Sequence, residues 1–136
     1  MEEYFEELSK EYEIGDKEVD SLSPLVLAYV GDSIYDLFIR VHLISKGGRK
    51  VGCLHSNAIG YVKAGSQKST LDSISVTLTD EEKNVVRRGR NAGSATVPKN
   101  ADVVEYRLAT GFEALLGYLF LKKKTGRLMD ILKKCL

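Results

Sequence analysis

Two acidic residues lie in stretches of sequence that are otherwise mostly apolar. Asp32 follows Gly31 within LAYVGDSIYDLFIR, residues 27–40, and Glu113 is the only charged residue of ATGFEALLGYLFL, residues 109–121. An ionised carboxylate in apolar surroundings is compensated by a cation, by hydrogen bonds or by protonation. If the two acids meet, one must take up a proton unless a cation such as Mg²⁺ lies between them.

Small residues flank both acids and favour close packing of the two segments. They are Ala28 and Gly31 near Asp32, and Ala109, Gly111, Ala114 and Gly117 around Glu113. The alternative is that each acid faces solvent separately or accepts a hydrogen bond from a tyrosine or threonine in the core. The residues alone leave both interpretations open.

The spacing of apolar residues predicts an all-α fold, a helical bundle, because they recur every three or four residues and long alternating runs are absent. Ser23 and Pro24 predict the start of a helix that runs to about Ser45. Thr79 and Glu82 form a capping box for a helix to about Arg90. The other predicted helices cover 2–13, 52–67, 69–76, a long helix from Asn100 or Asp102 to about Lys122, and 126–135.

Composition narrows the class of protein. A chain of 136 residues with 43% apolar residues fits one domain with a hydrophobic core. No apolar run is long enough to span a membrane and the acidic N-terminus does not resemble a signal peptide, so we expect a cytoplasmic protein. Cys53 and Cys135 are too few for a disulfide framework, and Cys53 with His55 lacks two further zinc ligands.

Charge is distributed unevenly along the chain. Residues 1–20 hold nine acids and two lysines, a net charge of −7, whereas residues 21–136 hold 18 basic and 10 acidic residues, a net charge of +8. We therefore divide the single domain into an acidic N-terminal helix or leader, 1–20, and a basic body, 21–136. A basic body fits a polyanion such as nucleic acid, and we hypothesise that the leader masks it.

Two motifs resemble the signatures of the ribonuclease III catalytic domain. YVGDSI, residues 29–34, resembles the run that carries a metal-binding aspartate, and FEALLG, residues 112–117, resembles the run whose glutamate ligates the same Mg²⁺. The segment 88–100, with Tyr106 and Arg107, is similar to one branch, the bacterial Mini-ribonuclease III proteins. In that branch the catalytic domain stands without a double-stranded RNA-binding domain. The resemblance covers residues 21–136 and implies an all-α, ribonuclease III-type endonuclease domain.

The resemblance also implies an activity. It is that of a Mg²⁺-dependent endoribonuclease that cleaves double-stranded RNA, with Asp32 and Glu113 as catalytic residues and metal ligands. It further implies a homodimer, to which the aromatic residues Tyr29, Tyr35 and Phe38 would contribute if they are not needed in the core. The implied role is maturation of large-subunit (23S) ribosomal RNA, with a ribosomal protein as a candidate helper.

This chain departs from the family pattern at the metal site. The family has glutamates where this chain has Leu25 and Ala28, and a carboxylate where it has Thr110. Of the four usual metal-site acids, the two at positions 28 and 110 are missing, which favours a single Mg²⁺ completed by water. The alternatives are an inactive ribonuclease III-like module that binds RNA or a ribosomal partner, and a helical protein-binding domain that docks through its acidic leader.

Double-stranded RNA is recognised mainly through its backbone, so cations and amides are the expected ligands. The segment 89–100 is rich in turn-forming residues and amides and is a predicted binding loop. The predicted RNA-binding residues are Arg88, Arg90, Asn91, Lys99 and Asn100, with Lys50, Lys63 and Lys68 as weaker additions. His42 lies in the apolar run IRVHLI and is predicted to be packed rather than catalytic.

Overall fold

The computed structural model describes residues 2–92, 97, 99 and 102–136, and every regular element in these ranges is helical. The all-α prediction is confirmed. No helix in the described ranges is long and apolar enough to cross a membrane. The elements are α1 (Glu2–Glu11), α2 (Asp16–Ser21), α3 (Pro24–Ser45), α4 (Val51–Val62), α5 (Ala64–Ile74), the 3₁₀ helix η1 (Ser75–Thr77), α6 (Asp80–Asn91), α7 (Val103–Leu121) and α8 (Thr125–Lys133).

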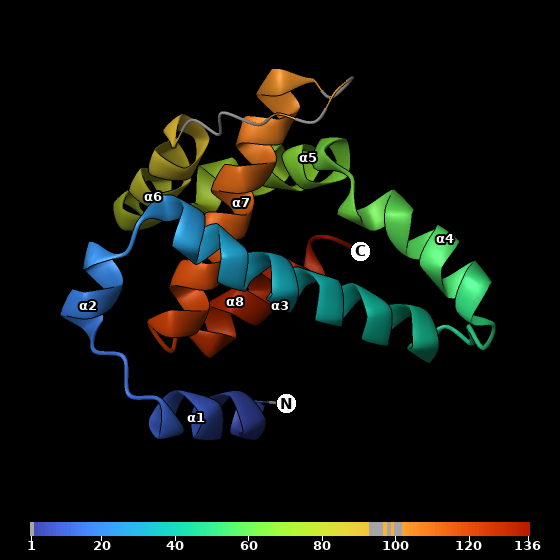
Figure 1. The fold of residues 1–136 in the computed structure, drawn as a ribbon, viewed down its shortest axis with the longest axis horizontal. Helices are drawn as coiled ribbons and strands as arrows, with labels where there is room; N and C mark the ends of the chain where they lie inside the picture. Colours follow the sequence, from blue (N-terminus) through green and yellow to red (C-terminus); the bar gives the residue numbers. More distant parts are fainter. Residues whose placement is uncertain (1, 93–96, 98, 100–101) are drawn as a thin grey trace.

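Helix α7 lies at the centre of the bundle. Helices α3, α5 and α6 pack around it, and α3 crosses it at a steep angle (Figure 1). Phe112, Leu115, Leu116 and Leu119 of α7 have no exposed surface. The burial of these side chains contributes to the hydrophobic core, and it explains why the segment around Glu113 carries so little charge.

The predicted starts of three helices are confirmed by side-chain caps. Ser23 accepts a hydrogen bond from the backbone amide of Val26 at the start of α3. Thr79 and Glu82 form the complete capping box of α6. Asp102 accepts from the amide of Glu105, 3.0 Å away, and so begins α7. The caps at Ser23 and Asp102 fix the starts of the two helices that carry Asp32 and Glu113.

The predicted helix over 52–67 is interrupted in the structure. Lys63 is extended, with φ −62° and ψ 143°, so α4 ends at Val62 and α5 begins at Ala64. The break redirects the chain so that Leu71 and Ile74 of α5 are buried in the core. Packing against α7 therefore overrides the helical pattern that continues through Lys63 in the sequence.

The N-terminal segment contains a second short helix that was not predicted. Val19 of α2 is 1% exposed, and Asp20 pairs with Lys122 across 2.8 Å. The first helix ends at Glu11, earlier than predicted, and Phe5 packs on the edge of Phe120 with ring centroids 5.2 Å apart. The functional division at residue 20 stays a prediction.

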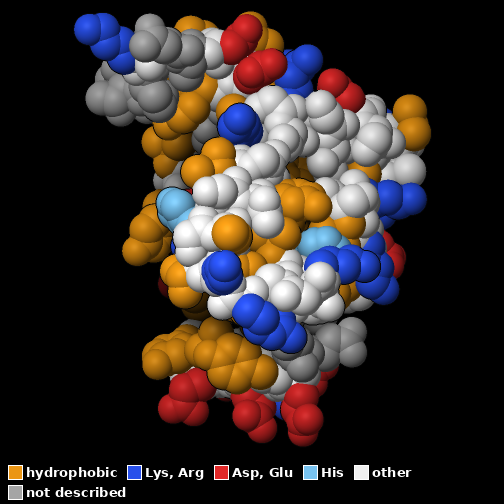
Figure 2. Space-filling model, turned by 90° about the vertical axis from the view of Figure 1, so that its right-hand side faces the viewer, with side chains coloured by type: hydrophobic (Ala, Val, Ile, Leu, Met, Phe, Trp, Pro, Cys, Tyr) orange, Lys and Arg blue, Asp and Glu red, His pale blue; other side chains and the backbone are white. Residues whose placement is uncertain are grey.

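The acidic side chains of α1 lie away from the basic body. Figure 2 shows a group of acidic side chains at the end of the molecule that α1 occupies, apart from the lysine and arginine side chains on the rest of that face. Among the described residues, no ion pair joins α1 to another element. Within the described part of the chain, the one ion pair between the leader and the basic body is that of Asp20 with Lys122, so masking of the wider basic surface by the leader stays a prediction.

Candidate active site

The backbones of α3 and α7 are in direct contact at two glycines. A Cβ atom on Gly31 would lie 1.8 Å from the carbonyl oxygen of Glu113, and one on Gly117 would lie 1.9 Å from the carbonyl oxygen of Leu27. Neither position admits a side chain without moving a helix. Because Asp32 follows Gly31 and Glu113 belongs to the contact itself, the crossing brings the two acids together.

A second glycine contact places the end of α6 against α7. A Cβ on Gly89 would lie 2.7 Å from the Cα of Gly111, and one on Gly111 would lie 2.6 Å from the carbonyl oxygen of Val86. Arg90 follows directly in the chain. The close approach therefore sets Arg90 beside the helix that carries Glu113.

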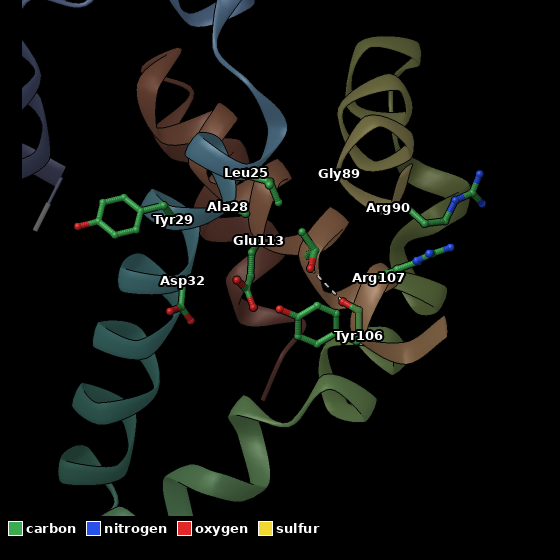
Figure 3. Close-up of a pocket in the computed structure, with 10 residues that line it drawn as sticks. Leu25, Ala28, Tyr29, Asp32, Gly89, Arg90, Tyr106, Arg107 and Glu113 are labelled. Carbon is green, nitrogen blue, oxygen red and sulfur yellow. Dashed lines mark hydrogen bonds between the residues drawn. The ribbon is translucent and has the colours of Figure 1, made fainter. Parts of the chain in front are cut away.

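A cavity of about 170 Å³ opens between these three helices. In Figure 3, the carboxylates of Asp32 and Glu113 extend into the same space from α3 and α7, and the hydroxyl of Tyr106 points toward Glu113. Arg90 and Arg107 extend to the opposite side, away from the carboxylates (Figure 3). The lining residues are Leu25, Ala28, Tyr29, Asp32, Gly89, Arg90, Tyr106, Arg107, Thr110 and Glu113.

The two carboxylates differ in their surroundings. The pKa of Glu113 is raised to about 7, mainly by burial and also by the negative charge of Asp32, while a side-chain hydrogen bond with Gln67 acts in the opposite direction. Asp32 is more exposed, and its pKa is raised by partial burial and by the charge of Asp36. Without a cation, Glu113 is therefore the acid that holds a proton near neutral pH.

The donor set of this cavity suits a hydrated magnesium ion. Two carboxylates from different helices extend into one cavity, and Mg²⁺ accepts one or two carboxylates while keeping several waters. In the described ranges, no group of three or more His, Cys, Asp or Glu side chains gathers at any point to form a site made of protein ligands alone. The residues fit a magnesium ion completed by water or substrate oxygens.

The three positions that depart from the family pattern all line this cavity. Leu25, Ala28 and Thr110 are among its lining residues, so the acids that the resemblance leads one to expect would have pointed here. The hydroxyl of Thr110 donates to the carbonyl oxygen of Tyr106 across 3.0 Å. It is thereby satisfied by its own helix.

The structure separates the predicted RNA-binding residues. Arg90 lines the cavity, and its Nε donates to the side chain of Asn91, 3.3 Å away, in the last turn of α6. Lys99 is exposed, and Asn100 lies outside the described residues. Residues 89–91 belong to α6, so the predicted loop begins later than expected.

Arg88 does not belong to this cavity. It is partly buried on the other side of α6, where it donates to the carbonyl oxygen of Leu22 across 3.4 Å and lines a separate cavity with Asp20 and Lys122. The side chains of adjacent helical residues point about 100° apart. The prediction grouped Arg88 with the loop 89–100 and so missed this separation.

Gln67, Tyr106 and Arg107 are site residues that the sequence reasoning did not assign. Tyr106 and Arg107 line the cavity, and Gln67 reaches Glu113 from α5 while only 2% exposed. Tyr106 precedes Glu113 by seven residues, about two helical turns, so the spacing itself indicates that they share a face. No local pattern around Gln67 indicates its contact with Glu113.

The remaining candidates behave as ordinary structural groups. His42 is partly buried and packs on the edge of Tyr61, with ring centroids 6.1 Å apart. Lys68 pairs with Asp72 of its own helix across 3.8 Å. Cys53 is exposed and Cys135 partly buried, and neither forms a disulfide.

Comparison with known proteins assigns the family. The ribonuclease III domain matches residues 25–124. A Mini-ribonuclease 3 from Thermoanaerobacter is 50% identical over 83% of this chain and 80% of its own length, and one from Enterococcus faecalis is 45% identical over 88% and 92%. A Fusobacterium nucleatum protein of known crystal structure superposes with a TM-score of 0.77, at 31% identity, over 83% of this chain and 90% of that one. The chain therefore belongs to the ribonuclease III family of endoribonucleases, in the branch of the Mini-ribonuclease 3 proteins.

Proposed function

We propose that this endoribonuclease cleaves double-stranded RNA with a Mg²⁺ ion that Asp32 and Glu113 hold together. The observation that carries the proposal is the meeting of these two carboxylates, from two different helices, in one cavity of a ribonuclease III-type fold. The relatives named Mini-ribonuclease 3 support the same class of reaction. Phosphodiester hydrolysis needs a nucleophilic water and neutralisation of phosphate charge, and both suit a carboxylate-bound cation.

The part of the protein itself in the reaction is to hold the cation in position. When bound, Mg²⁺ supplies an acidified water and neutralises the phosphate oxygens. Asp32 and Glu113 bind best as carboxylates, so Glu113 releases the proton that burial and Asp32 favour in the free protein. The glycine contact of α3 and α7 fixes the distance between the two ligands before the ion binds.

Arginine side chains provide the expected contact with RNA. Arg90 and Arg107 line the cavity on the side away from the carboxylates, where they can neutralise the phosphates that flank the cleaved bond. With Asn91, Lys99 and Asn100 they form the proposed RNA-binding set. Arg88 lies outside this set in the structure, where its guanidinium donates to the carbonyl oxygen of Leu22, and its contact with RNA stays a prediction.

The proposal includes a homodimer in which each copy cuts one strand. Tyr35 is 1% exposed and Phe38 packs against the core, so these two aromatics are used within one chain. Tyr29 is 79% exposed, and its neighbours Leu25 and Val26 are each 45% exposed. This apolar start of α3, beside the cavity, is the surface that we propose for the second copy.

The proposed substrate is a base-paired region of the precursor of large-subunit (23S) ribosomal RNA, in the cytoplasm, with a ribosomal protein as a candidate helper. Cleavage of such a precursor, free and with ribosomal proteins bound, tests the proposed substrate and helper separately from the cleavage activity on double-stranded RNA.

The direct test of the activity is cleavage of a long double-stranded RNA by the native protein, Asp32→Asn and Glu113→Gln, with and without a chelator. We expect Mg²⁺-dependent cleavage that falls at least about 100-fold in both variants, because several kcal/mol of metal-derived stabilisation is lost. Asp36→Asn is the matched control, since Asp36 lies one turn away on α3 and pairs with Arg40 across 3.1 Å.

Each other outcome identifies an alternative. A native protein that binds RNA in a salt-dependent way but never cuts it is an inactive RNA-binding module. Weak, salt-insensitive RNA binding without cleavage indicates a protein-binding domain, because phosphate contacts make affinity fall with salt.

A further inference from the structure

The carboxylate pair has few polar neighbours within the cavity. Of the positions where the family pattern leads one to expect more acids, Ala28 and Leu25 have no polar side chain, and the hydroxyl of Thr110 is bonded to the backbone of Tyr106. Arg90 and Arg107 extend away from the carboxylates (Figure 3). This leaves the two tyrosines of the lining, Tyr29 and Tyr106, as candidates for a further polar group at the metal.

The two tyrosines differ in direction. The ring of Tyr29 extends outward from α3 and is 79% exposed, whereas the hydroxyl of Tyr106 points into the cavity toward Glu113 (Figure 3). Tyr106 is only partly exposed. Of these two tyrosines, only Tyr106 points its hydroxyl toward the carboxylates.

The geometry of α7 favours this direction. Tyr106 and Glu113 are seven residues apart, about two turns, and therefore lie on one face of the helix. Side chains of a helix tilt toward its N-terminus, so Glu113 leans toward Tyr106. The Thr110 hydroxyl, which bonds the carbonyl of Tyr106, supports the turn between them.

We propose that Tyr106 is a positioning residue of this site, whose phenol hydroxyl orients the Glu113 carboxylate and the water around the bound Mg²⁺. The inference rests on the proposed function. It adds to the site the neutral phenol of Tyr106, where the family pattern would have further acids. A phenol can donate one hydrogen bond and accept another. It adds no negative charge where Asp32 and Glu113 already repel each other. Side chains that hydrogen-bond to the ligands of a metal, and not to the metal itself, orient those ligands and strengthen metal binding.

The test is Tyr106→Phe, which removes one oxygen and keeps the ring. Mn²⁺, an ion that also favours oxygen ligands, is titrated into the full-length protein without RNA and followed by electron paramagnetic resonance. Single-turnover cleavage of double-stranded RNA in Mg²⁺ then gives the rate constant and the RNA concentration at half-maximal rate. Tyr61→Phe is the matched control, since Tyr61 is also partly buried but packs on His42 outside this cavity.

In Tyr106→Phe we expect Mn²⁺ affinity or the cleavage rate constant to fall about 10- to 100-fold, the range for outer-shell partners of a metal. The RNA concentration at half-maximal rate should stay within about twofold, because the phosphate-binding arginines are unchanged. Tyr61→Phe should match the native protein in every measurement, and the midpoint of thermal unfolding should agree among all three.

Two results would overturn the inference and are distinguishable. If the native protein binds Mn²⁺ and cleaves RNA, and Tyr106→Phe does both equally well, the role of Tyr106 is wrong and the proposed function stands. If the native protein neither binds the ion nor cleaves RNA, the proposed function fails and the inference fails with it.

Discussion

Gly31 of α3 and Gly117 of α7 lie against each other at the helix crossing. A Cβ on Gly31 would be 3.0 Å from the amide nitrogen of Gly117, and a Cβ on Gly117 would be 3.2 Å from the amide nitrogen of Gly31. This contact explains why a helix that is built to be buried carries glycine next to its aspartate. Gly31 allows α7 to approach α3, and this approach places Asp32 near Glu113 of α7.

The first prediction concerns this contact. Gly31→Ala should lower the free energy of unfolding by at least about 3 kcal/mol, the upper range for overpacking, because its Cβ would fall on the Glu113 backbone. Gly52→Ala in α4 is the control: its Cβ meets nothing within 4 Å, so the change should stabilise the helix by about 0.5–1 kcal/mol. Urea denaturation measures both, and equal effects would contradict the close crossing.

The second prediction concerns pH in the absence of metal. Glu113 has a pKa of about 7 in the folded protein against an ordinary 4.5, so the folded state binds this proton more tightly than the unfolded state. Its contribution to stability is therefore complete below about pH 4.5 and is lost as pH rises toward 7, by up to about 3 kcal/mol.

Denaturant unfolding of chelator-treated protein between pH 5 and 8 measures this loss. Glu113→Gln should remove it. Asp32→Asn should lower the pKa of Glu113 while leaving it above 4.5, because burial is the larger cause. A native protein whose unfolding free energy has the same pH dependence as Glu113→Gln would contradict the assigned burial and repulsion.

The third prediction concerns a buried ion pair far from the cavity. Glu82 is 3% exposed, accepts from Arg127 Nε across 3.0 Å and also caps α6. Arg127→Met should cost about 2–3 kcal/mol at neutral pH, somewhat less than for a fully buried pair because Arg127 is partly exposed. Lys124→Met, which breaks the exposed 3.8 Å pair with Glu81, should cost less than about 1 kcal/mol.

The pKa of Glu82 is lowered by the hydrogen bond from Arg127 and by the cap, which together outweigh its burial. Its stabilising contribution is thus present above pH 4.5 and is lost as pH falls through the lower pKa of the folded state. The difference between the native protein and Arg127→Met should shrink in acid. A difference that stays constant with pH would show that packing, and not charge, accounts for the effect of Arg127.

The fourth prediction concerns RNA affinity. In an Asp32→Asn background that does not cleave, Arg107→Gln should weaken binding to double-stranded RNA and reduce the slope of log affinity against log salt by about 1, the effect of one lost phosphate contact. Arg87→Gln is the control, since Arg87 is exposed on α6 and does not line the cavity. Filter binding at several salt concentrations measures both slopes, and equal slopes would remove Arg107 from the RNA contact.

The sequence predicts the helices better than their junctions. Caps are local, so Ser23, Thr79 and Asp102 could be identified from neighbouring residues, and the structure confirms them. The break at Lys63 depends on how α5 packs against α7, which is a contact between distant parts of the chain. Helical periodicity carries no information about that contact.

The candidate site shows the same limit. The small residues around Asp32 and Glu113 favour a contact between their helices, because two helix backbones can come into contact where glycine leaves no side chain between them. Gln67 comes from a third helix and Arg88 turns toward Leu22, so neither place could be predicted without the packed fold.

Calorimetric titration of Mg²⁺ into the native protein, Asp32→Asn and Glu113→Gln, without RNA at pH 8, shows whether the two carboxylates bind the same ion. We predict one ion for each native chain and loss of binding in both variants, since each carboxylate supplies one ligand to that ion. A variant that binds Mg²⁺ as tightly as the native protein would show that the two carboxylates do not share a metal site.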